Sequence, residues 1–176
     1  MKYQLRDYQK KASDAAVMYF KMKSGRNGLL VLPTGAGKSL IIADIAARLE
    51  EPLIVFQPNK EILEQNFAKL QTYGIWDCSI YSASVGRKEI SRITFATIGS
   101  VIRHMKDFQH FKNILIDECH LVKPSDGMYK RFFEQAERRI VGLTATPYRL
   151  YSCMNGSMLK FLTRTRPRVF SQVLYY

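Results

Sequence analysis

The sequence predicts an α/β protein in which helices cover both faces of a mostly parallel sheet. Helix-length amphipathic segments alternate with short runs that are apolar throughout, and a glycine-rich turn follows the first of these runs. Strands buried on both faces have this composition, and parallel strands need crossover segments of helix length. A chain of 176 residues can bury one substantial core, so we expect a single domain over residues 1–176.

The first elements follow from the spacing of apolar residues. Between Leu5 and Phe20 these residues recur at helical spacing, which predicts a helix over residues 5–22. A turn cluster at residues 25–28 ends this helix. Residues 28–32 are the first wholly apolar run and predict a strand, and a second amphipathic helix follows the glycine-rich turn.

The remaining strand candidates are short apolar runs between helix-length segments. They are Leu53–Phe56, Cys78–Tyr81, Ile93–Ala96, Ile114–Ile116 and Ile140–Leu143. Asn59 stands before an amphipathic segment that contains Leu63, Phe67 and Leu70, so we expect it to cap that helix. The segment from Pro147 onward is basic and only weakly periodic.

Charge is the unusual quantity in the composition. The chain has 27 Lys and Arg against 15 Asp and Glu, for a formal net charge of +12. This excess fits a polyanionic partner, because bound cations release counterions from phosphates, but ordinary solvated lysines explain it equally well. Residues 1–26 and 147–176 contribute most of the excess, outside the motifs described below. Charge is therefore supporting evidence only.

Neither a membrane span nor a cysteine framework is predicted. No apolar run approaches the roughly 18–20 residues of a spanning helix, and residues 1–7 contain no apolar signal region. We therefore expect a cytoplasmic protein with no membrane partner. Cys78, Cys119 and Cys153 are odd in number and far apart, and they lack the CxxC spacing of many zinc sites.

The segment from Leu32 to Ser39 carries the strongest motif. It departs from the pattern G-x-x-x-x-G-K-[ST] only at Leu32. Gly35 and Gly37 would let the backbone curl so that successive N–H groups meet phosphate oxygens, at the positive end of the following helix. Lys38 would neutralise the β- and γ-phosphates, and the hydroxyl of Ser39 would bind magnesium. The alternative is a loop that merely turns.

Two adjacent acids follow the apolar run Ile114–Ile116. In open parallel sheets, ligands bind at the carboxyl ends of the strands. Neighbouring residues of a strand point to opposite sides, so the two acids can do different work. Asp117 would hold magnesium, and Glu118 would orient and deprotonate an attacking water. The alternative is a pair of loop acids that cap a helix.

Together these segments resemble the first RecA-like domain of superfamily 2 helicases and translocases of the DEAD/DEAH type. The resemblance runs from Leu5 to about Leu150 and implies a P-loop NTPase fold with ATP and Mg²⁺ as cofactors. In that superfamily a residue other than glycine is common at the Leu32 position. The resemblance implies that Gln9 reads the adenine edge; the alternative is an exposed glutamine on the first helix. The implied nucleotide-binding residues are Arg6, Gln9, Thr34, Gly35, Ala36, Gly37, Lys38 and Ser39.

The resemblance also implies catalytic and coupling residues. Asp117, Glu118 and His120 match a DExH motif and, with Lys38, would carry catalysis. Residues 142–147 resemble the segment that couples the nucleotide and nucleic-acid sites. Its members are Thr144, Ala145 and Thr146, and the two hydroxyls can bond to His120 or to the acids. The alternative is a simple turn at the end of a strand.

Two further segments resemble the nucleic-acid face of the family, where contacts go to backbone phosphates. The implied residues are Pro58, Asn59 and Lys60 in one segment and Thr97, Gly99 and Ser100 in the other. Hydroxyl groups and backbone amides can bond to phosphates without reading bases. Helix capping is the alternative for each segment.

Within the superfamily, the runs LRDYQ, VLPTGAGKSL, IDECH and GLTATPYRL look most like RadD-type bacterial DNA-repair helicases, which implies DNA rather than RNA as the partner. Residues 169–175 look like the last strand of the first domain. We therefore expect the N-terminal part of a longer protein whose second RecA-like domain supplies an arginine to the γ-phosphate. Such an arginine is worth about 10³–10⁵ in rate, so this chain alone should barely hydrolyse ATP.

Two other functions stay open at this stage. One is a duplex DNA translocase of the type I restriction subunit kind. The other is a nucleotide-gated nucleic-acid-binding module without motor activity. The presence of Lys38, Asp117 and Glu118 argues against the second, because a module that only binds has no need of a general base.

Overall fold

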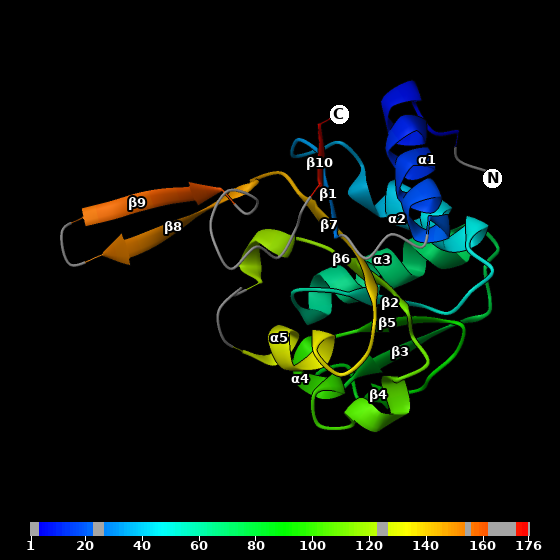
Figure 1. Cartoon of the computed structure of the whole chain (residues 1–176). Helices are drawn as coiled ribbons and strands as arrows, with labels where there is room; N and C mark the ends of the chain where they lie inside the picture. Colours follow the sequence, from blue (N-terminus) through cyan, green and yellow to red (C-terminus); the bar gives the residue numbers. More distant parts are fainter. Residues whose placement is uncertain (1–3, 23–26, 123–126, 154–155, 162–171, 176) are drawn as a thin grey trace.

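The computed structural model describes residues 4–22, 27–122, 127–153, 156–161 and 172–175. In these residues one sheet has eight strands: β1 (Gly28–Val31), β2 (Leu53–Phe56), β3 (Cys78–Ser82), β4 (Arg87–Lys88), β5 (Ile93–Ala96), β6 (Asn113–Ile116), β7 (Arg139–Thr144) and β10 (Gln172–Tyr175). Their order is β10-β1-β7-β6-β2-β5-β3-β4 (Figure 1). All neighbours pair in parallel except β3 and β4, so the predicted parallel sheet is confirmed.

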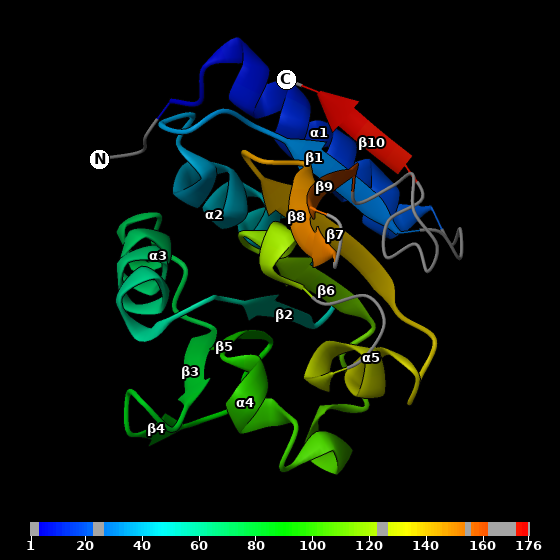
Figure 2. The same ribbon diagram turned by 90° about the vertical axis from the view of Figure 1, so that its left-hand side faces the viewer.

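Helices cover both faces of this sheet, as predicted. The α-helices are α1 (Asp7–Lys21), α2 (Lys38–Arg48), α3 (Lys60–Thr72), α4 (Ile98–Val101) and α5 (Met128–Phe133), and the 3₁₀ turns are η1 (Met105–Phe108) and η2 (Cys119–Leu121). Figures 1 and 2 show α1, α2 and α3 on one side of the strands and α4 and α5 on the other. The arrangement is that of the doubly covered α/β class.

Two hydrophobic cores, one on each face, hold the layers together. Strand β2 shows the alternation that separates them, because Leu53 and Val55 belong to the core under α1 to α3 while Ile54 and Phe56 belong to the other. The ring of Phe56 meets the ring of Phe132 from α5 edge to face at 5.3 Å. Every residue of β2 is buried, which is why its sequence is apolar throughout.

Most predicted elements are confirmed with small shifts at their ends. Helix α1 begins at Asp7 rather than at residue 5, because Arg6 is extended and its backbone N–H donates to Oε1 of Gln9 at 2.9 Å. Asn59 caps α3 as predicted: its Oδ1 accepts a hydrogen bond from the N–H of Ile62 at 2.9 Å. The alternative reading of Asn59, helix capping, is therefore correct for its side chain.

The region after residue 147 was not predicted in full. It forms an antiparallel hairpin of β8 (Tyr148–Cys153) and β9 (Gly156–Phe161), which extends away from the main sheet in Figure 1. The run YRLYSC lacks the period-two alternation that would indicate a strand. The predicted last strand over residues 169–175 is present as β10, parallel to β1; residues 169–171 lie outside the described part.

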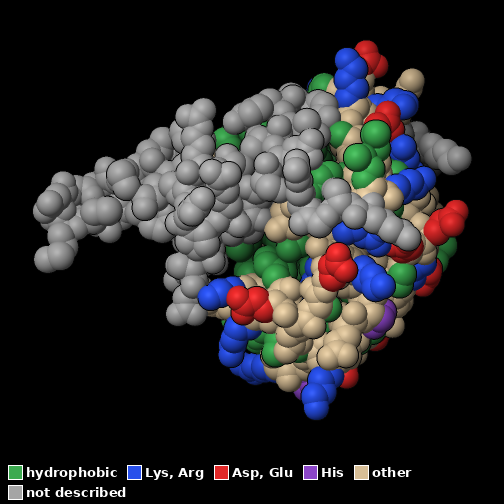
Figure 3. All heavy atoms as spheres, viewed as in Figure 1, with side chains coloured by type: hydrophobic (Ala, Val, Ile, Leu, Met, Phe, Trp, Pro, Cys, Tyr) green, Lys and Arg blue, Asp and Glu red, His purple; other side chains and the backbone are tan. Residues whose placement is uncertain are grey.

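The structure bears on two expectations from the sequence, one about membrane-spanning helices and one about the distribution of charge. Among the described residues no helix combines the length and apolar character that a bilayer crossing requires. Over the coloured part of the face in Figure 3, basic and acidic side chains are interspersed rather than gathered by sign.

Candidate nucleotide site and nucleic-acid surface

The glycine-rich segment forms a curled loop between β1 and α2. Gly35 and Gly37 have φ of 79° and 74°, in the left-handed region that favours glycine. The N–H of Ala36 donates to the carbonyl of Pro33 at 3.1 Å, which closes the turn, and α2 begins directly at Lys38. The first N–H groups of a helix lack intrahelical partners and carry its positive dipole end, so this loop has the geometry of an anion cradle.

Helix α1 supports this loop through Gln9, which is only 4% exposed. Its Nε2 donates to the carbonyl of Ala36 at 2.8 Å, and the hydroxyl of Tyr8 donates to the same carbonyl at 3.2 Å. A Cβ on Gly37 would lie 2.5 Å from Nε2 of Gln9, so any other residue there would push this side chain away from the loop. The alternative of an exposed glutamine is wrong, because this side chain is buried against the loop.

Asp117 lies directly after β6 at the carboxyl edge of the sheet and is 6% exposed. Its Oδ1 accepts from the N–H of Glu118 at 3.0 Å, and its Oδ2 accepts from Nδ2 of Asn66 at 3.1 Å. Burial, with the neighbouring charge of Glu118, raises the pKa of Asp117 to about 6. The hydrogen bonds hold this carboxylate in place, and its buried negative charge costs free energy. A bound cation would offset that cost, so the carboxylate is suited to binding one.

Glu118 points to different partners from Asp117, as the prediction of separate roles requires. Its φ of 46° is the one positive value among the described residues other than glycine. One carboxylate oxygen forms an ion pair with Nζ of Lys38, and the other lies 3.3 Å from Nδ1 of His120. The glycine-rich loop and the acid pair, far apart in sequence, are thus in direct contact.

The end of β7 joins the same group of side chains. Oγ1 of Thr144 and Nδ1 of His120 are 2.9 Å apart, which is one of the hydrogen bonds that the sequence predicts. Thr146 makes no such bond to His120; its N–H instead donates to Oγ1 of Thr144 at 3.0 Å. Lys38, Glu118, His120 and Thr144 therefore form one continuous chain of contacts across three strand ends.

The sequence did not predict one partner of Asp117, Asn66, or the residue Gln57 that shares the amide of Asn66. Nδ2 of Asn66, in α3, donates both to Asp117 and to Oε1 of Gln57 at 3.1 Å, and Asn66 is 3% exposed. Its signal in the sequence is a polar residue on the buried side of an amphipathic helix, next to Phe67. Gln57 directly follows β2 and stands one residue before Pro58.

The six residues predicted to contact nucleic acid all line one pocket of about 480 Å³. Its other lining residues are Ala83, Ser84, Lys88, Arg103 and His104. The cations Lys60, Lys88 and Arg103 are exposed there, and the last two were not predicted because only the folded sheet brings them to this edge. The residues fit a surface for a phosphate backbone.

The two predicted hydroxyl groups of this pocket are engaged within the protein. Oγ of Ser100 accepts from the N–H of Ala83 at 2.9 Å and lies 3.0 Å from Oγ1 of Thr97. Thr97 precedes α4 but makes no capping bond with its side chain, so the capping alternative is wrong for Thr97. The pair holds α4 against the turn between β3 and β4.

Whether this site can hold Mg²⁺ depends on the atoms that its side chains offer as ligands. Asp117 offers a buried carboxylate and Ser39, in the first turn of α2, offers a hydroxyl. Hard oxygen donors of this kind are those that Mg²⁺ prefers. The residues therefore fit the ion.

Comparison with known proteins agrees with this geometry. A family described as "Type III restriction enzyme, res subunit" matches residues 2–149. The DNA 3'-5' translocase XPB2 of Sulfurisphaera tokodaii is 30% identical over 151 residues, which cover 84% of this chain and 32% of that protein. The DNA 3'-5' helicase XPB of Mycobacterium tuberculosis is 29% identical over 154 residues, covering 82% and 27%.

A solved structure supports the fold alone. The UvsW helicase of bacteriophage T4 matches with a TM-score of 0.69 at 18% identity, over 99% of this chain and 61% of that one. The chain spans about a third of the length of the curated relatives given above. Because the matched family covers most of the sequence, the chain belongs to the family of the type III restriction enzyme res subunit.

Proposed function

We propose that the chain is the ATP-binding part of an ATP-dependent nucleic-acid motor that couples hydrolysis to strand separation or translocation. One observation carries the proposal: the chain of contacts from Lys38 through Glu118 and His120 to Thr144. It joins the anion cradle, a general base and the end of β7 into one unit. A module that only bound nucleotide would need the cradle alone.

In this proposal the glycine-rich loop binds the phosphates of ATP. The turn at Gly35 and Gly37 directs backbone N–H groups and the start of α2 toward them, and Lys38 adds a positive charge. Ser39 and Asp117 would hold Mg²⁺, which neutralises charge on the β- and γ-phosphates when it is bound. The roles of Arg6 and Gln9 at the base, and of Thr34 and Ala36 at the phosphates, belong to the same proposal.

Glu118 is the proposed general base. Its left-handed backbone turns the side chain toward Lys38 and His120, away from the buried partners of Asp117. A carboxylate in this place can orient a water and accept its proton as the γ-phosphate is attacked. His120 would hold one oxygen of Glu118 while its ring is fixed by Thr144.

The proposed partner is the phosphate backbone of DNA along the pocket at the ends of β2 and β5. Its contacts would come from the exposed cations Lys60, Lys88 and Arg103 and from backbone amides such as that of Gly99. The proposal of DNA follows the names of the two XPB relatives, which refer to DNA.

Coupling would pass from the nucleotide site through side chains that are bonded to the acids but lie outside the nucleic-acid pocket. Thr144 and Thr146, with Ala145 between them, connect His120 to the end of β7. On the other side, Asn66 and Gln57 connect Asp117 to the segment that starts at Pro58. A change in the charge around the acids can thus alter the nucleic-acid pocket through direct contacts.

The domain division, the subfamily, a second domain and the location are further proposals. We assign the chain to one domain, and to the RadD-type bacterial DNA-repair helicases on the sequence runs given above. We further propose a second RecA-like domain in the same polypeptide and a cytoplasmic location. The length of the relatives supports a longer polypeptide, since the chain corresponds to 32% and 27% of them.

A duplex translocase is the second candidate, because one relative is named a translocase and another a helicase. A strand-displacement assay on the complete polypeptide, beside a triplex-displacement assay that reports translocation, separates the two. Displacement of a paired strand supports unwinding; triplex displacement without it supports translocation alone.

The nucleic-acid surface is tested by charge reversal. Lys88→Glu with Arg103→Glu should weaken DNA binding by about 10- to 100-fold and reduce its salt dependence, because two phosphate contacts are lost. Lys11→Glu with Lys21→Glu, at two exposed lysines of α1 outside the pocket, is the matched control. Equal weakening by this control would mean that only net charge matters and would overturn the assignment.

A further inference from the structure

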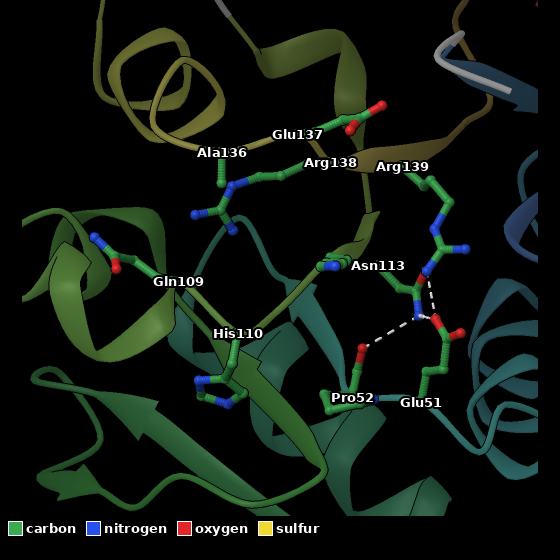
Figure 4. A pocket seen from close by; sticks show the side chains of 10 residues that line it. Glu51, Pro52, Gln109, His110, Asn113, Ala136, Glu137, Arg138 and Arg139 are labelled. Atoms are coloured by element: carbon green, nitrogen blue, oxygen red, sulfur yellow. Dashed lines mark hydrogen bonds and ion pairs between the residues drawn. The ribbon is translucent and has the colours of Figure 1, made fainter. Parts of the chain in front are cut away.

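A second pocket, of about 540 Å³, lies at the opposite edge of the sheet from the nucleotide site. The amino ends of β2, β6 and β7 meet there, with Asn113 in register with Leu53 and Arg139 (Figure 4). Strand β6 runs from this pocket to the residue before Asp117. The pocket is therefore separate from the nucleotide site and does not depend on the proposed function.

Arg138 in the wall of this pocket carries a buried positive charge. It is 7% exposed, and its Nη1 donates to the carbonyls of Phe111 at 2.9 Å and Phe108 at 3.4 Å. The guanidinium carbon lies 3.8 Å from the centre of the Phe132 ring. Nε and Nη2 are buried without a hydrogen-bond partner. Burial lowers the pKa of Arg138 to about 10, so the group is still charged at neutral pH.

No carboxylate in the described part of the chain lies within ion-pair distance of Arg138, although two acids line the pocket. Glu51 forms an ion pair with Arg139 and accepts from Nδ2 of Asn113 at 3.0 Å. Glu137 is exposed, and Figure 4 shows its carboxylate directed away from the guanidinium of Arg138. The partners of Arg138 are thus neutral carbonyls and an aromatic ring.

The space in front of Arg138 is free of acids and rimmed by groups that can donate. Figure 4 shows its guanidinium directed between Ala136, Gln109 and His110. His110 and Lys112 are exposed at the rim. A buried charge without a counter-charge costs free energy, and an unsatisfied buried polar group calls for a partner such as an ion.

We propose that this half of the pocket binds a small anion, a phosphate or a carboxylate group, as the counter-charge of Arg138. Nε and Nη2 are shielded from bulk water, so little solvent screens their charge and its field extends into the pocket. Lys112 and His110 supply donors at the rim, and charge-assisted hydrogen bonds to an anion are stronger than neutral ones.

Titration of the ¹⁵N-labelled chain with inorganic phosphate, and separately with acetate, tests the proposal by NMR. The readouts are the amides of residues 109–113 and 136–139 and the Nε–H signal of Arg138. Phosphate bound to the glycine-rich loop shifts residues 35–39 instead, so the two sites are distinguished. We expect saturable shifts at the pocket with at least one anion; the anion that gives them identifies the group as phosphate or carboxylate.

Charge reversal provides the matched comparison. Lys112→Glu should weaken binding at the pocket by about tenfold and leave the titration of residues 35–39 unchanged. Lys106→Glu makes the same change at an exposed residue of η1 that does not line the pocket, and should leave both titrations unchanged. Both positions are exposed, so neither substitution threatens the fold.

Three results would overturn the proposal. They are shifts confined to residues 35–39, no saturation at the pocket with either anion, and equal weakening by Lys112→Glu and Lys106→Glu. In each case Arg138 would serve only to hold the carbonyls of Phe108 and Phe111 against the start of β7.

Discussion

Lys38 and Glu118 form an ion pair between the start of α2 and the end of β6, although 79 residues separate them in the sequence. Both side chains are mostly buried, so their charges attract more strongly than on an open surface. The proposed phosphate ligand would compete with Glu118 for Lys38. The arrival of ATP would therefore free the proposed base at the moment when it is needed.

Glu118→Gln should separate nucleotide binding from hydrolysis. The amide keeps the shape but loses the charge, so Lys38 becomes more available and the Kd for ATP should stay the same or fall. Turnover by the complete polypeptide should drop by about 10²–10⁴, the usual value of a general base. Fluorescence titration and a phosphate-release assay measure the two effects. Unchanged turnover would mean that Glu118 is not the base.

Gly37→Ala should destabilise the protein more than Gly35→Ala does. Both residues have positive φ, which costs alanine about 1–2 kcal/mol. Only at Gly37 does the new Cβ meet Nε2 of Gln9, at 2.5 Å, whereas nothing lies within 4 Å at Gly35. Urea unfolding should show an extra loss of about 1 kcal/mol at Gly37, since the bond from Gln9 to Ala36 is displaced.

The contact itself is tested by adding Gln9→Ala to each glycine variant. The extra cost of Gly37→Ala should then disappear, because the atom that it meets has been removed. If the difference between Gly37→Ala and Gly35→Ala persists without Gln9, the clash is not its cause.

Asp117→Asn should stabilise the nucleotide-free protein above pH 6. The pKa of Asp117 is raised from 3.8 to about 6 in the folded state, so folding takes up a proton between these values. The unfolding free energy therefore falls as pH rises from about 4 to 6, and the neutral amide removes this loss. We expect a gain of about 1–2 kcal/mol at pH 7, because the amide keeps only one of the two hydrogen bonds to the carboxylate.

A pH series of urea midpoints for both proteins checks this. Below about pH 4, where the native side chain is protonated in both states, the variant should be the less stable protein by the hydrogen bond that it lacks, so the two curves should cross as the pH rises. A constant difference at every pH would show that the charge of Asp117 is not involved. Loss of Mg²⁺-dependent ATP affinity in the same variant is expected, because the amide is the poorer magnesium ligand.

Thr144→Val should uncouple the two sites. It removes the hydrogen bond to His120 and the acceptor for the N–H of Thr146 while keeping the size of the side chain. Nucleotide affinity should hold, while stimulation of ATP hydrolysis by DNA should fall by about 2- to 30-fold. Thr146→Val is the comparison, since its hydroxyl only approaches Thr144 at 3.5 Å. An equal effect of Thr146→Val would contradict the assigned pathway.

Local signals in the sequence were enough for the parallel strands of the main sheet and for the turn of the glycine-rich loop. The apolar run of β2 and the two glycines of the loop depend only on their near neighbours, and both predictions are confirmed. Contacts between segments that are distant in the sequence were harder to predict. The bond from Asn66 to Asp117 spans 51 positions and depends on how α3 packs on the sheet.

The basic residues of the nucleic-acid pocket could not be predicted from the sequence for the same reason. Lys88 and Arg103 carry no motif, and they join the predicted nucleic-acid residues only because β4 and α4 meet at one edge. The hairpin of β8 and β9 was missed because its first strand lacks regular alternation. Arg138 looks like any other arginine in the sequence, and its isolation from acids is visible only after folding.

The rate of ATP hydrolysis, with and without DNA, tests the central claim most directly. The complete polypeptide should be stimulated by DNA, and Lys38→Ala should abolish the activity. The 176-residue chain alone should be slower by about 10³–10⁵, the worth of an arginine supplied from elsewhere. Fast hydrolysis by the chain alone, stimulated by nucleic acid, would contradict the account.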